Sequence, residues 1–170
     1  PSKSFNTAGL MQSNVICSDI EMRRRVDRVI NIFEVCEVNP FGPDALVAAY
    51  NESEEWLDEL NRYLYDNYLE LKRFFAEYMP KIEVLKLEGT YLVWVDISAL
   101  EFTSDELEAK LRDEGKVYLN SGTMYGRRAG QGYMRINIAC PRSRMIDGLT
   151  RMAKVLAPYM EDDCDMGCPS

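Results

Sequence analysis

The sequence predicts an α+β fold in which a long helix precedes a mixed or antiparallel sheet with helices on one face. The first observation is the helical spacing of apolar residues over 53–78. The second is the order strand, strand, helix, strand, strand, helix that the apolar patterns predict after residue 80. The third is the segment 1–50, which holds too little predicted strand to bury a sheet of its own. We therefore expect 80–160 to be a small domain and 1–50 to be the remnant of a larger one.

The stretch 53–78 carries the strongest periodic signal. Its large side chains recur every three or four residues and would share one helix face: Leu57, Leu60, Leu64, Tyr68, Leu71, Phe75 and Tyr78. At about 1.5 Å per residue the helix would be about 40 Å long. We expect a helix with boundaries 51–79 to connect two structural units.

Two apolar patterns lie upstream of this helix. A short run at 14–17 between two serines predicts a buried strand. Asp19 can then cap a helix, and the apolar residues of that helix recur at helical spacing: Met22, Val26, Val29, Ile30 and Phe33. Proline and glycine at 40–43 end regular structure before a short helix at 45–50.

The segment after residue 80 changes to period two. Residues 82–87 and 91–97 predict a hairpin with Gly89 at its turn. Thr103 opens a short helix that stops at Gly115. Strands at 117–119 and 133–140 follow, and then a helix over 144–159 whose inward residues are Met145, Leu149, Met152 and Leu156. The glycines of the loop 120–132 are too loosely spaced for a phosphate-binding fingerprint, so we expect a flexible loop. We expect 161–170 to be disordered.

The composition describes a globular, acidic chain. It has 170 residues, 46% of them hydrophobic, which is enough for a substantial core. The formal net charge of -8 repels nucleic-acid phosphates and anionic membrane surfaces, so neither is an expected partner. No apolar run reaches the roughly 20 residues that span a bilayer, and no signal-peptide pattern is present. We expect a cytoplasmic location.

The residue types exclude several catalytic classes. The chain contains no histidine, which excludes Ser-His-Asp and Cys-His catalysis because both need an imidazole base. Five cysteines make an odd number and are expected to be free thiols. Cys164 and Cys168 lie close together, but two thiols without histidine make a poor zinc site, and no metal is expected.

Lys3 lies in the segment PSKSFNTAGL that spans residues 1–10. A lysine near a terminus is ordinarily a solvated charge. This segment, however, closely resembles the lysine motif of fold-type I pyridoxal 5'-phosphate (PLP) enzymes, above all the MalY- and PatB-type cystathionine β-lyases. The resemblance implies that Lys3 forms the Schiff base with the cofactor. It also implies that the Ser2 hydroxyl binds the cofactor phosphate, with an ordinary turn serine as the alternative.

The chemistry of this family explains why a lysine is needed. A primary amine gives an imine that a substrate amine can displace, and the released amine can then move a proton at the substrate α-carbon. To attack, the amine must be neutral near pH 7, which burial or a nearby cation can arrange.

One position departs from a pattern of the wider family. Many aminotransferases of this fold have an arginine shortly after the lysine that pairs with the phosphate, and this chain has Met11 there. The MalY-like subgroup also tends to lack that arginine. The departure favours a carbon–sulfur lyase over a typical aminotransferase.

Arg135 lies in the segment MRINIACPR. Strand alternation places Met134, Ile136 and Ile138 on one face and Arg135 and Asn137 on the other. On the pattern alone, Arg135 would be a solvated charge. The segment resembles the family motif whose first arginine holds the α-carboxylate of the amino-acid substrate. A guanidinium suits that role because its planar fork makes two parallel bonds to a carboxylate and stays charged.

Two weaker matches keep the same register. The segment 88–96 resembles the Gly-Thr-Tyr-Leu hairpin of the family, in which the glycine, here Gly89, approaches the substrate; an ordinary hairpin turn is the alternative. The segment 39–42 resembles a turn at the dimer interface, which would make Phe41 an interface residue of a homodimer; core packing is the alternative.

The resemblance covers 1–159 and implies the C-terminal segment of a PLP-dependent C–S lyase or aminotransferase, with the fold-type I small domain at its end. The substrate would be a small amino acid such as cystathionine or cysteine. A missing N-terminal large domain would supply the ring-stacking aromatic, the aspartate and the phosphate donors, so the isolated chain would be inactive. The alternative is a non-catalytic α+β interaction module whose apolar surface at 14–50 binds a copy of itself or another chain.

Overall fold

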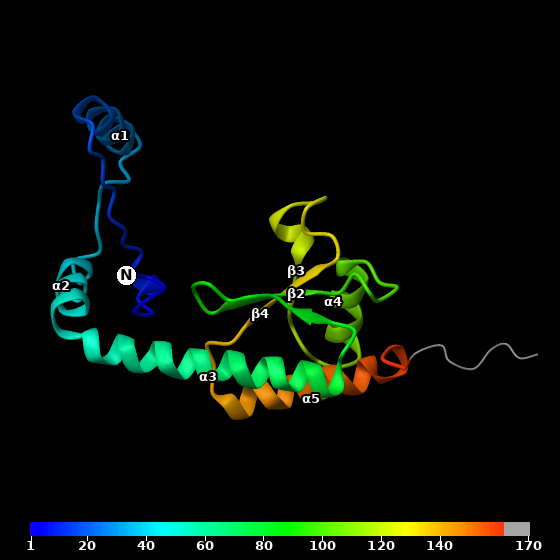
Figure 1. Ribbon diagram of the computed structural model, residues 1–170. Helices are drawn as coiled ribbons and strands as arrows, with labels where there is room; N and C mark the ends of the chain where they lie inside the picture. Colours follow the sequence, from blue (N-terminus) through cyan, green and yellow to red (C-terminus); the bar gives the residue numbers. More distant parts are fainter. Residues whose placement is uncertain (162–170) are drawn as a thin grey trace, which may run out of the picture. The chain divides into compact units, whose positions relative to one another are not determined.

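The computed structural model describes residues 1–161, and the chain forms two compact units. The first unit is Pro1–Asn61 and the second begins at Arg62. The helix α3 (Glu54–Tyr78) starts in the first unit and continues into the second (Figure 1). This is the long helix that the periodic pattern predicts. The tail expected to be disordered and the pair Cys164 and Cys168 lie outside the described residues, apart from Glu161.

The first unit is built from helices. It contains the 3-10 helix η1 (Ala8–Leu10), α1 (Ile20–Ile32), α2 (Gly42–Glu52) and the first turns of α3. Asp19 caps α1 as expected, because its carboxylate accepts a hydrogen bond of 2.6 Å from the Met22 amide. Pro43 lies in the first turn of α2, where its missing amide hydrogen costs no helical bond.

The strand predicted at 14–17 is not formed, and that prediction is wrong for this chain. The segment has no regular secondary structure, and its Val15 and Ile16 are 62% and 92% exposed. A strand needs a neighbour that pairs with its backbone amides and carbonyls. No strand lies within residues 1–61 to provide one.

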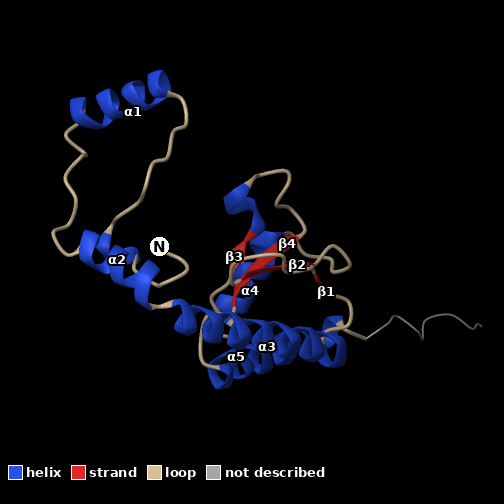
Figure 2. Cartoon of the chain, turned by 60° about the vertical axis from the view of Figure 1, so that its left-hand side comes forward, coloured by secondary structure: helices blue, strands red, loops and turns tan. Residues whose placement is uncertain are grey.

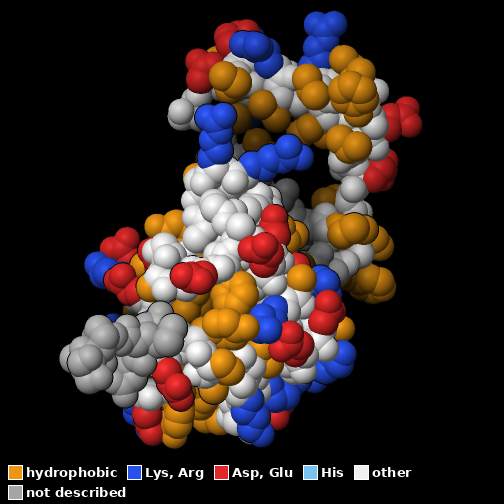
Figure 3. Space-filling model, turned by 90° about the vertical axis from the view of Figure 1, so that its right-hand side faces the viewer, with side chains coloured by type: hydrophobic (Ala, Val, Ile, Leu, Met, Phe, Trp, Pro, Cys, Tyr) orange, Lys and Arg blue, Asp and Glu red, His pale blue; other side chains and the backbone are white. Residues whose placement is uncertain are grey.

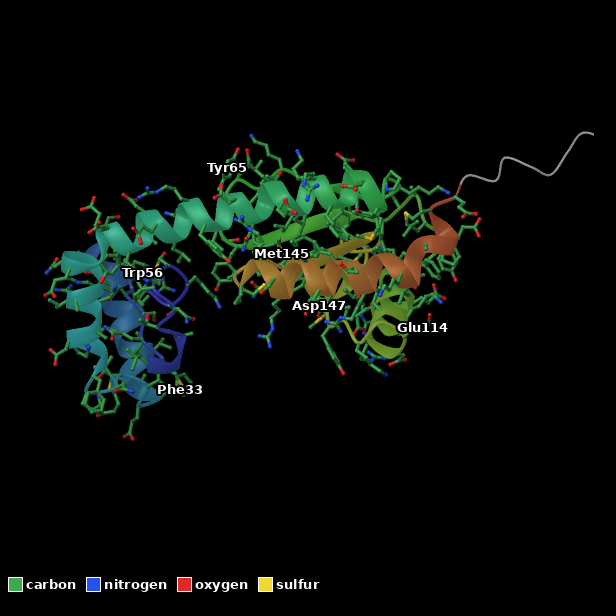
Figure 4. The ribbon with its side chains drawn as sticks, turned by 90° about the horizontal axis from the view of Figure 1, so that it is seen from below. Phe33, Trp56, Tyr65, Glu114, Met145 and Asp147 are labelled. Carbon is green, nitrogen blue, oxygen red and sulfur yellow. The ribbon has the colours of Figure 1, made fainter. Side chains whose placement is uncertain are left out.

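The apolar side of α1 also has no cover in the first unit. None of its residues is buried, and Phe33, which follows its last residue, is 72% exposed. Figure 3 shows hydrophobic side chains on the surface of α1 at the top of the view, and Figure 4 shows Phe33. The exposed apolar surface that the sequence predicts for 14–50 is therefore present.

The second unit contains a four-stranded antiparallel sheet. Its strands are β1 (Glu83–Val84), β2 (Leu92–Asp96), β3 (Asn120–Ser121) and β4 (Tyr133–Asn137), in the spatial order β1-β2-β4-β3 (Figures 1 and 2). The hairpin formed by β1 and β2 confirms the period-two pattern.

The strand predicted at 117–119 lies instead at β3. The Val117 amide bonds to the Leu111 carbonyl at 3.0 Å, which keeps this segment in the turn that leaves the preceding helix. Val117 and Leu119 then line a small cavity together with residues of the terminal helix. The side chains of Val117 and Leu119 therefore pack towards the terminal helix, and the backbone joins the sheet only at the following residues.

Three helices cover one face of this sheet, as the sequence predicts. They are the part of α3 after Arg62, α4 (Ser104–Asp113) and α5 (Arg142–Leu156), which η3 (Ala157–Tyr159) extends. Figures 1, 2 and 4 show α3 and α5 side by side along the sheet. The end of α4 adjoins α5, since Arg151 donates to the Gly115 carbonyl at 3.1 Å. The residues that these layers bury include Leu71, Phe75, Val93, Val95, Leu107, Leu111, Met134, Ile136, Met145, Leu149, Met152 and Leu156.

The predicted face of α3 is fully buried only in the middle of the helix, since the leucines at 57 and 60 are half-buried. Leu64, Tyr68, Leu71 and Phe75 are buried, but Tyr78 is 50% exposed. The sequence pattern also missed Asn67, which is fully buried. No described helix has the length and apolar character that crossing a membrane requires.

Candidate functional site

Arg135 lies at the centre of the sheet, in the middle of β4. It pairs in register with Trp94 of β2 on one side and with Asn120 of β3 on the other. Its neighbours Met134 and Ile136 are buried towards the helices, and Arg135 is half-buried on the opposite face. The predicted alternation is therefore confirmed.

An aromatic ring covers the guanidinium of Arg135. The ring belongs to Tyr125, the last residue of the 3-10 helix η2 (Gly122–Tyr125), and its centroid lies 4.1 Å from the guanidinium carbon. Among residues 1–161, no carboxylate pairs with Arg135 and no hydrogen bond engages its guanidinium. The site thus holds a cation whose hydrogen-bond donors are not used.

The two residues that flank Arg135 in the sheet hold the Tyr125 ring. The side-chain amide of Asn120 donates to the Tyr125 hydroxyl at 2.7 Å. Trp94 meets the same ring edge to face, with centroids 5.5 Å apart and planes at 87°. We call Trp94, Asn120, Tyr125 and Arg135 the arginine cluster.

Asp105 fixes the short helix that carries Tyr125. Its carboxylate, in the first turn of α4, accepts hydrogen bonds from the hydroxyls of Ser121 and Thr123. These bonds lower the pKa of Asp105, with the bond from Ser121 as the larger cause. Asp105 therefore stays ionised at neutral pH and joins α4 to the start of η2.

An apolar pocket adjoins the arginine cluster and shares Trp94 and Tyr125 with it. Its volume is about 310 Å³. The remaining lining residues are Leu85, Gly122, Ala129, Gly130 and Tyr133.

The second arginine of the MRINIACPR segment has a different role. Arg142 begins α5, and its Nε donates to the side-chain oxygen of the buried Asn67 at 3.1 Å. The amide of Asn67 in turn donates to the carbonyls of Ile138 and Cys140 at 3.1 and 3.2 Å. These bonds fix the chain where it leaves β4, so Arg142 has a structural function.

The nearby thiol of Cys140 is not an activated nucleophile. Burial raises its pKa, and the positive charge of Arg144 only partly opposes that shift. The thiol is therefore protonated at neutral pH, and the thiolate is the nucleophilic form.

Lys3 lies in the first unit, in a turn closed by a 2.9 Å bond from the Phe5 amide to the Pro1 carbonyl. Its side chain is exposed. The Phe5 ring contacts Tyr50 and Trp56, with centroids 5.5 and 6.3 Å apart, and so attaches the turn to α2 and α3. Figure 4 labels Trp56 in the first turns of α3.

Ser2 and Thr7 carry hydroxyls in the same segment as Lys3. The Ser2 hydroxyl donates to the Gln12 carbonyl at 3.3 Å, a contact between positions ten residues apart. The Thr7 hydroxyl is buried and has no hydrogen-bond partner among the described residues. Lys3 and Arg135 belong to different units.

Gly89 lies in the exposed turn between β1 and β2. A Cβ added to Gly89 would meet nothing within 4 Å, and the positive φ in this turn, 64°, belongs to Thr90. Neither packing within the chain nor backbone conformation therefore requires glycine at this position.

Sequence reasoning missed Tyr125 and Asn120. Neither has a distinctive local pattern, and both reach Arg135 through strand register and the turn of η2. The alternation around Trp94 was the one available signal, because it places Trp94 on the sheet face opposite the buried Val93 and Val95.

Known proteins match the chain over most of its length. The model of the family "Aminotransferase class I and II" matches residues 1–151. Cystathionine β-lyase PatB from Bacillus subtilis is 36% identical over 157 residues, which is 92% of this chain and 40% of PatB.

Solved structures give the same result. A PLP-bound protein from Clostridium difficile 630 is 41% identical, with a TM-score of 0.88 over 92% of this chain and 40% of its own. Cystalysin from Treponema denticola, which contains PLP, is 31% identical, with a TM-score of 0.88 over 93% of this chain and 40% of its own. The chain thus spans about 40% of the length of each of these relatives. From its sequence and fold, the chain belongs to the class I and II aminotransferase family of fold-type I PLP enzymes.

Proposed function

We propose that this chain is the C-terminal part of a PLP-dependent C–S lyase of the cystathionine β-lyase type. The observation that carries the proposal is Arg135, a half-buried guanidinium with unused donors on the sheet face away from the helices. A planar fork of this kind suits the α-carboxylate of an amino-acid substrate. The proposed substrate is a small amino acid with a carbon–sulfur bond at its β-carbon, such as cystathionine or cysteine.

The residues around Lys3 fit a covalently held cofactor. The Lys3 amine is exposed and has no hydrogen-bond or ion-pair partner among residues 1–161. Ser2 and the unpartnered hydroxyl of Thr7 lie within four residues of it and can bind oxygen atoms of a phosphate. When bound, PLP supplies an electron sink for the charge left at the substrate α-carbon.

Four residues of this chain have a proposed task. Lys3 would hold the cofactor covalently, and its amine, once released, would take the proton from the substrate α-carbon. Arg135 binds the substrate carboxylate and so fixes which α-carbon bond faces the lysine. Ser2 donates to the cofactor phosphate. Gly89 leaves room for the substrate beside the β1–β2 turn.

Lyase chemistry is preferred over transamination for two reasons. Met11 stands where many aminotransferases have a phosphate-binding arginine. The names of PatB and of a Staphylococcus hominis C–S lyase, 31% identical with a TM-score of 0.80, also describe lyases. The candidate from another class is a non-catalytic interaction module, which the exposed apolar residues of α1 would favour.

The same proposal covers the architecture of the complete protein. Residues 1–50 would belong to the large PLP-binding domain, 51–79 would form the interdomain helix, and 80–160 would form the C-terminal small domain. Phe41, which is 73% exposed, would lie at the interface of a cytoplasmic homodimer. A large domain N-terminal to this chain would supply the remaining cofactor-binding groups, so the isolated chain would be inactive.

The test compares arginine variants of the complete protein loaded with PLP. Arg135→Ala is expected to lower kcat/KM for pyruvate release from cystathionine by about a hundredfold or more, because two charge-assisted hydrogen bonds are lost. Arg112→Ala is the matched control, since Arg112 is a partly exposed arginine of α4 that pairs with Glu108 and Asp113. Its activity should stay within about twofold of wild type.

Lys3→Ala completes the test because it distinguishes an enzyme from a module. The variant should lose both the imine absorbance and the release of pyruvate. Pyruvate release that survives either Lys3→Ala or Arg135→Ala unchanged would refute the proposed function.

A further inference from the structure

We propose that Tyr125 and Asn120 are positioning residues that hold Arg135 ready for the substrate carboxylate and thereby set the affinity of the site for amino acids. This inference rests on the proposed function, because it assumes that Arg135 binds the substrate. It is carried by the geometry of the arginine cluster.

The first step concerns how Tyr125 contacts Arg135. The guanidinium carbon lies 4.1 Å from the ring centroid, so the cation meets the negative face of the ring. A carboxylate binds a guanidinium through its N–H groups in the plane of the fork. The ring therefore restrains the arginine without using the donors that the substrate needs.

A carboxylate partner for Arg135 would behave differently. It would occupy the same N–H groups and neutralise the charge, so the substrate would have to displace it. Among the described residues, 1–161, no acidic side chain pairs with Arg135. Other arginines of this unit do have such partners, as Arg73 has in Glu70 at 2.6 Å and Arg151 in Asp147 at 2.9 Å.

The second step concerns what holds the ring. Asn120 and Trp94 occupy the register positions on either side of Arg135. Asn120 donates to the Tyr125 hydroxyl at 2.7 Å, and Trp94 meets the ring at 87°. The two strands that flank Arg135 thus also fix the ring that covers it. The bonds of Ser121 and Thr123 to Asp105 fix the backbone from which Tyr125 projects.

The consequence is an arginine whose conformation is set before the ligand arrives. An unrestrained arginine would lose rotamer freedom on binding, and this loss would reduce affinity. Removing the ring should therefore weaken the binding of carboxylate ligands by about three- to tenfold, the range expected for one cation–π contact. Ligands without a carboxylate should bind as before.

The experiment measures inhibition constants of two unreactive probes on the complete PLP-loaded protein. One probe is 3-(methylthio)propanoate, which has a carboxylate and no amine, and the other is 2-(methylthio)ethylamine, which has an amine and no carboxylate. The variants are Tyr125→Leu, Arg135→Ala and the double variant. Tyr118→Leu is the matched control, because Tyr118 is a 76% exposed tyrosine of the same unit.

The expected result has three parts. Tyr125→Leu weakens the carboxylate probe about three- to tenfold and leaves the amine probe unchanged. The double variant binds the carboxylate probe no more weakly than Arg135→Ala alone, because the ring acts only through the arginine. Tyr118→Leu binds both probes as wild type does.

A second pair of variants keeps the ring in place. Tyr125→Phe and Asn120→Ala each remove the 2.7 Å hydrogen bond. Each should weaken the carboxylate probe by about twofold, and together they should have no larger effect than either one alone.

The outcomes separate this inference from the proposed function. If Arg135→Ala weakens the carboxylate probe but Tyr125→Leu does not, or if Tyr125→Leu weakens both probes equally, the positioning role is wrong and the role of Arg135 stands. If Arg135→Ala leaves the carboxylate probe unaffected, the proposed substrate site is wrong and the positioning role with it.

Discussion

Two glycines, Gly122 and Gly130, allow two backbone segments to approach each other closely beside the arginine cluster. A Cβ on Gly122 would overlap the carbonyl oxygen of Gly130, and a Cβ on Gly130 would overlap that of Gly122. The sequence predicted a flexible loop here because its glycines match no binding fingerprint. Both glycines are buried and fix the base of the loop, whereas Met124 and residues 127–129 between them are exposed, so the expected flexibility of the loop stays a prediction. Sequence spacing alone could not distinguish close backbone approach from freedom of movement.

The glycines of this unit should therefore differ in what they tolerate. Gly122→Ala or Gly130→Ala should lower the free energy of unfolding by about 2 kcal/mol or more, because the backbone must shift to admit a methyl group. Gly89→Ala should change it by less than about 0.5 kcal/mol, since the space around Gly89 is open. Urea unfolding of the three variants measures the difference.

The same Gly89 variant tests its proposed contact with substrate. In the complete protein, Gly89→Ala should raise KM while stability stays unchanged, because the methyl group would enter the space proposed for the substrate. An unchanged KM would show that Gly89 belongs to an ordinary hairpin turn and does not contact the substrate.

At the level of elements, the sequence predicts helices better than strands. The start of α4 illustrates this, because Thr103 and Glu106 form a capping box, with each side chain bonded to the backbone amide of the other residue. A helix satisfies its hydrogen bonds within one segment, so local signals suffice. A strand depends on a neighbour, so β3 is displaced from its predicted position and the strand at 14–17 is absent.

Two carboxylates of α4 link its stability to pH. Hydrogen bonds from Ser121 and Thr123 lower the pKa of Asp105, and bonds from the amide and hydroxyl of Thr103 lower the pKa of Glu106. A carboxyl with a depressed folded pKa stabilises the fold at pH values above its unfolded pKa, and this stabilisation is lost as the pH falls through the folded pKa. The ordinary values are 3.8 for Asp and 4.5 for Glu. Acidification below about pH 4.5 should therefore lower the free energy of unfolding.

Neutral isosteres should reduce this pH dependence. Urea unfolding between about pH 7 and pH 3 should give a shallower acid decline for Asp105→Asn and Glu106→Gln than for wild type. The exposed Glu101 supplies the control variant Glu101→Gln, which should follow the wild-type profile. Identical profiles for all four proteins would show that these hydrogen bonds do not contribute to the acid response.

At the level of the whole molecule, the sequence predicts the family and a mixed or antiparallel sheet with helices on one face. The comparisons confirm the family, and the sheet is antiparallel. The resemblance also selected Arg135, whose half-buried position on the sheet face agrees with its proposed role. The sequence did not predict that the Tyr125 ring lies over Arg135 or that Asn120 bonds to the Tyr125 hydroxyl, because these contacts arise from strand register across three segments.

The central claim is that Lys3 carries the cofactor, and identifying the modified lysine tests it most directly. Borohydride treatment of the complete protein loaded with PLP reduces the lysine–cofactor imine to a stable amine. Digestion and mass spectrometry then identify the peptide that carries the added mass. We predict that the mass lies on the peptide containing Lys3 and is lost in Lys3→Ala. Modification of a different lysine, or of none, would contradict the account.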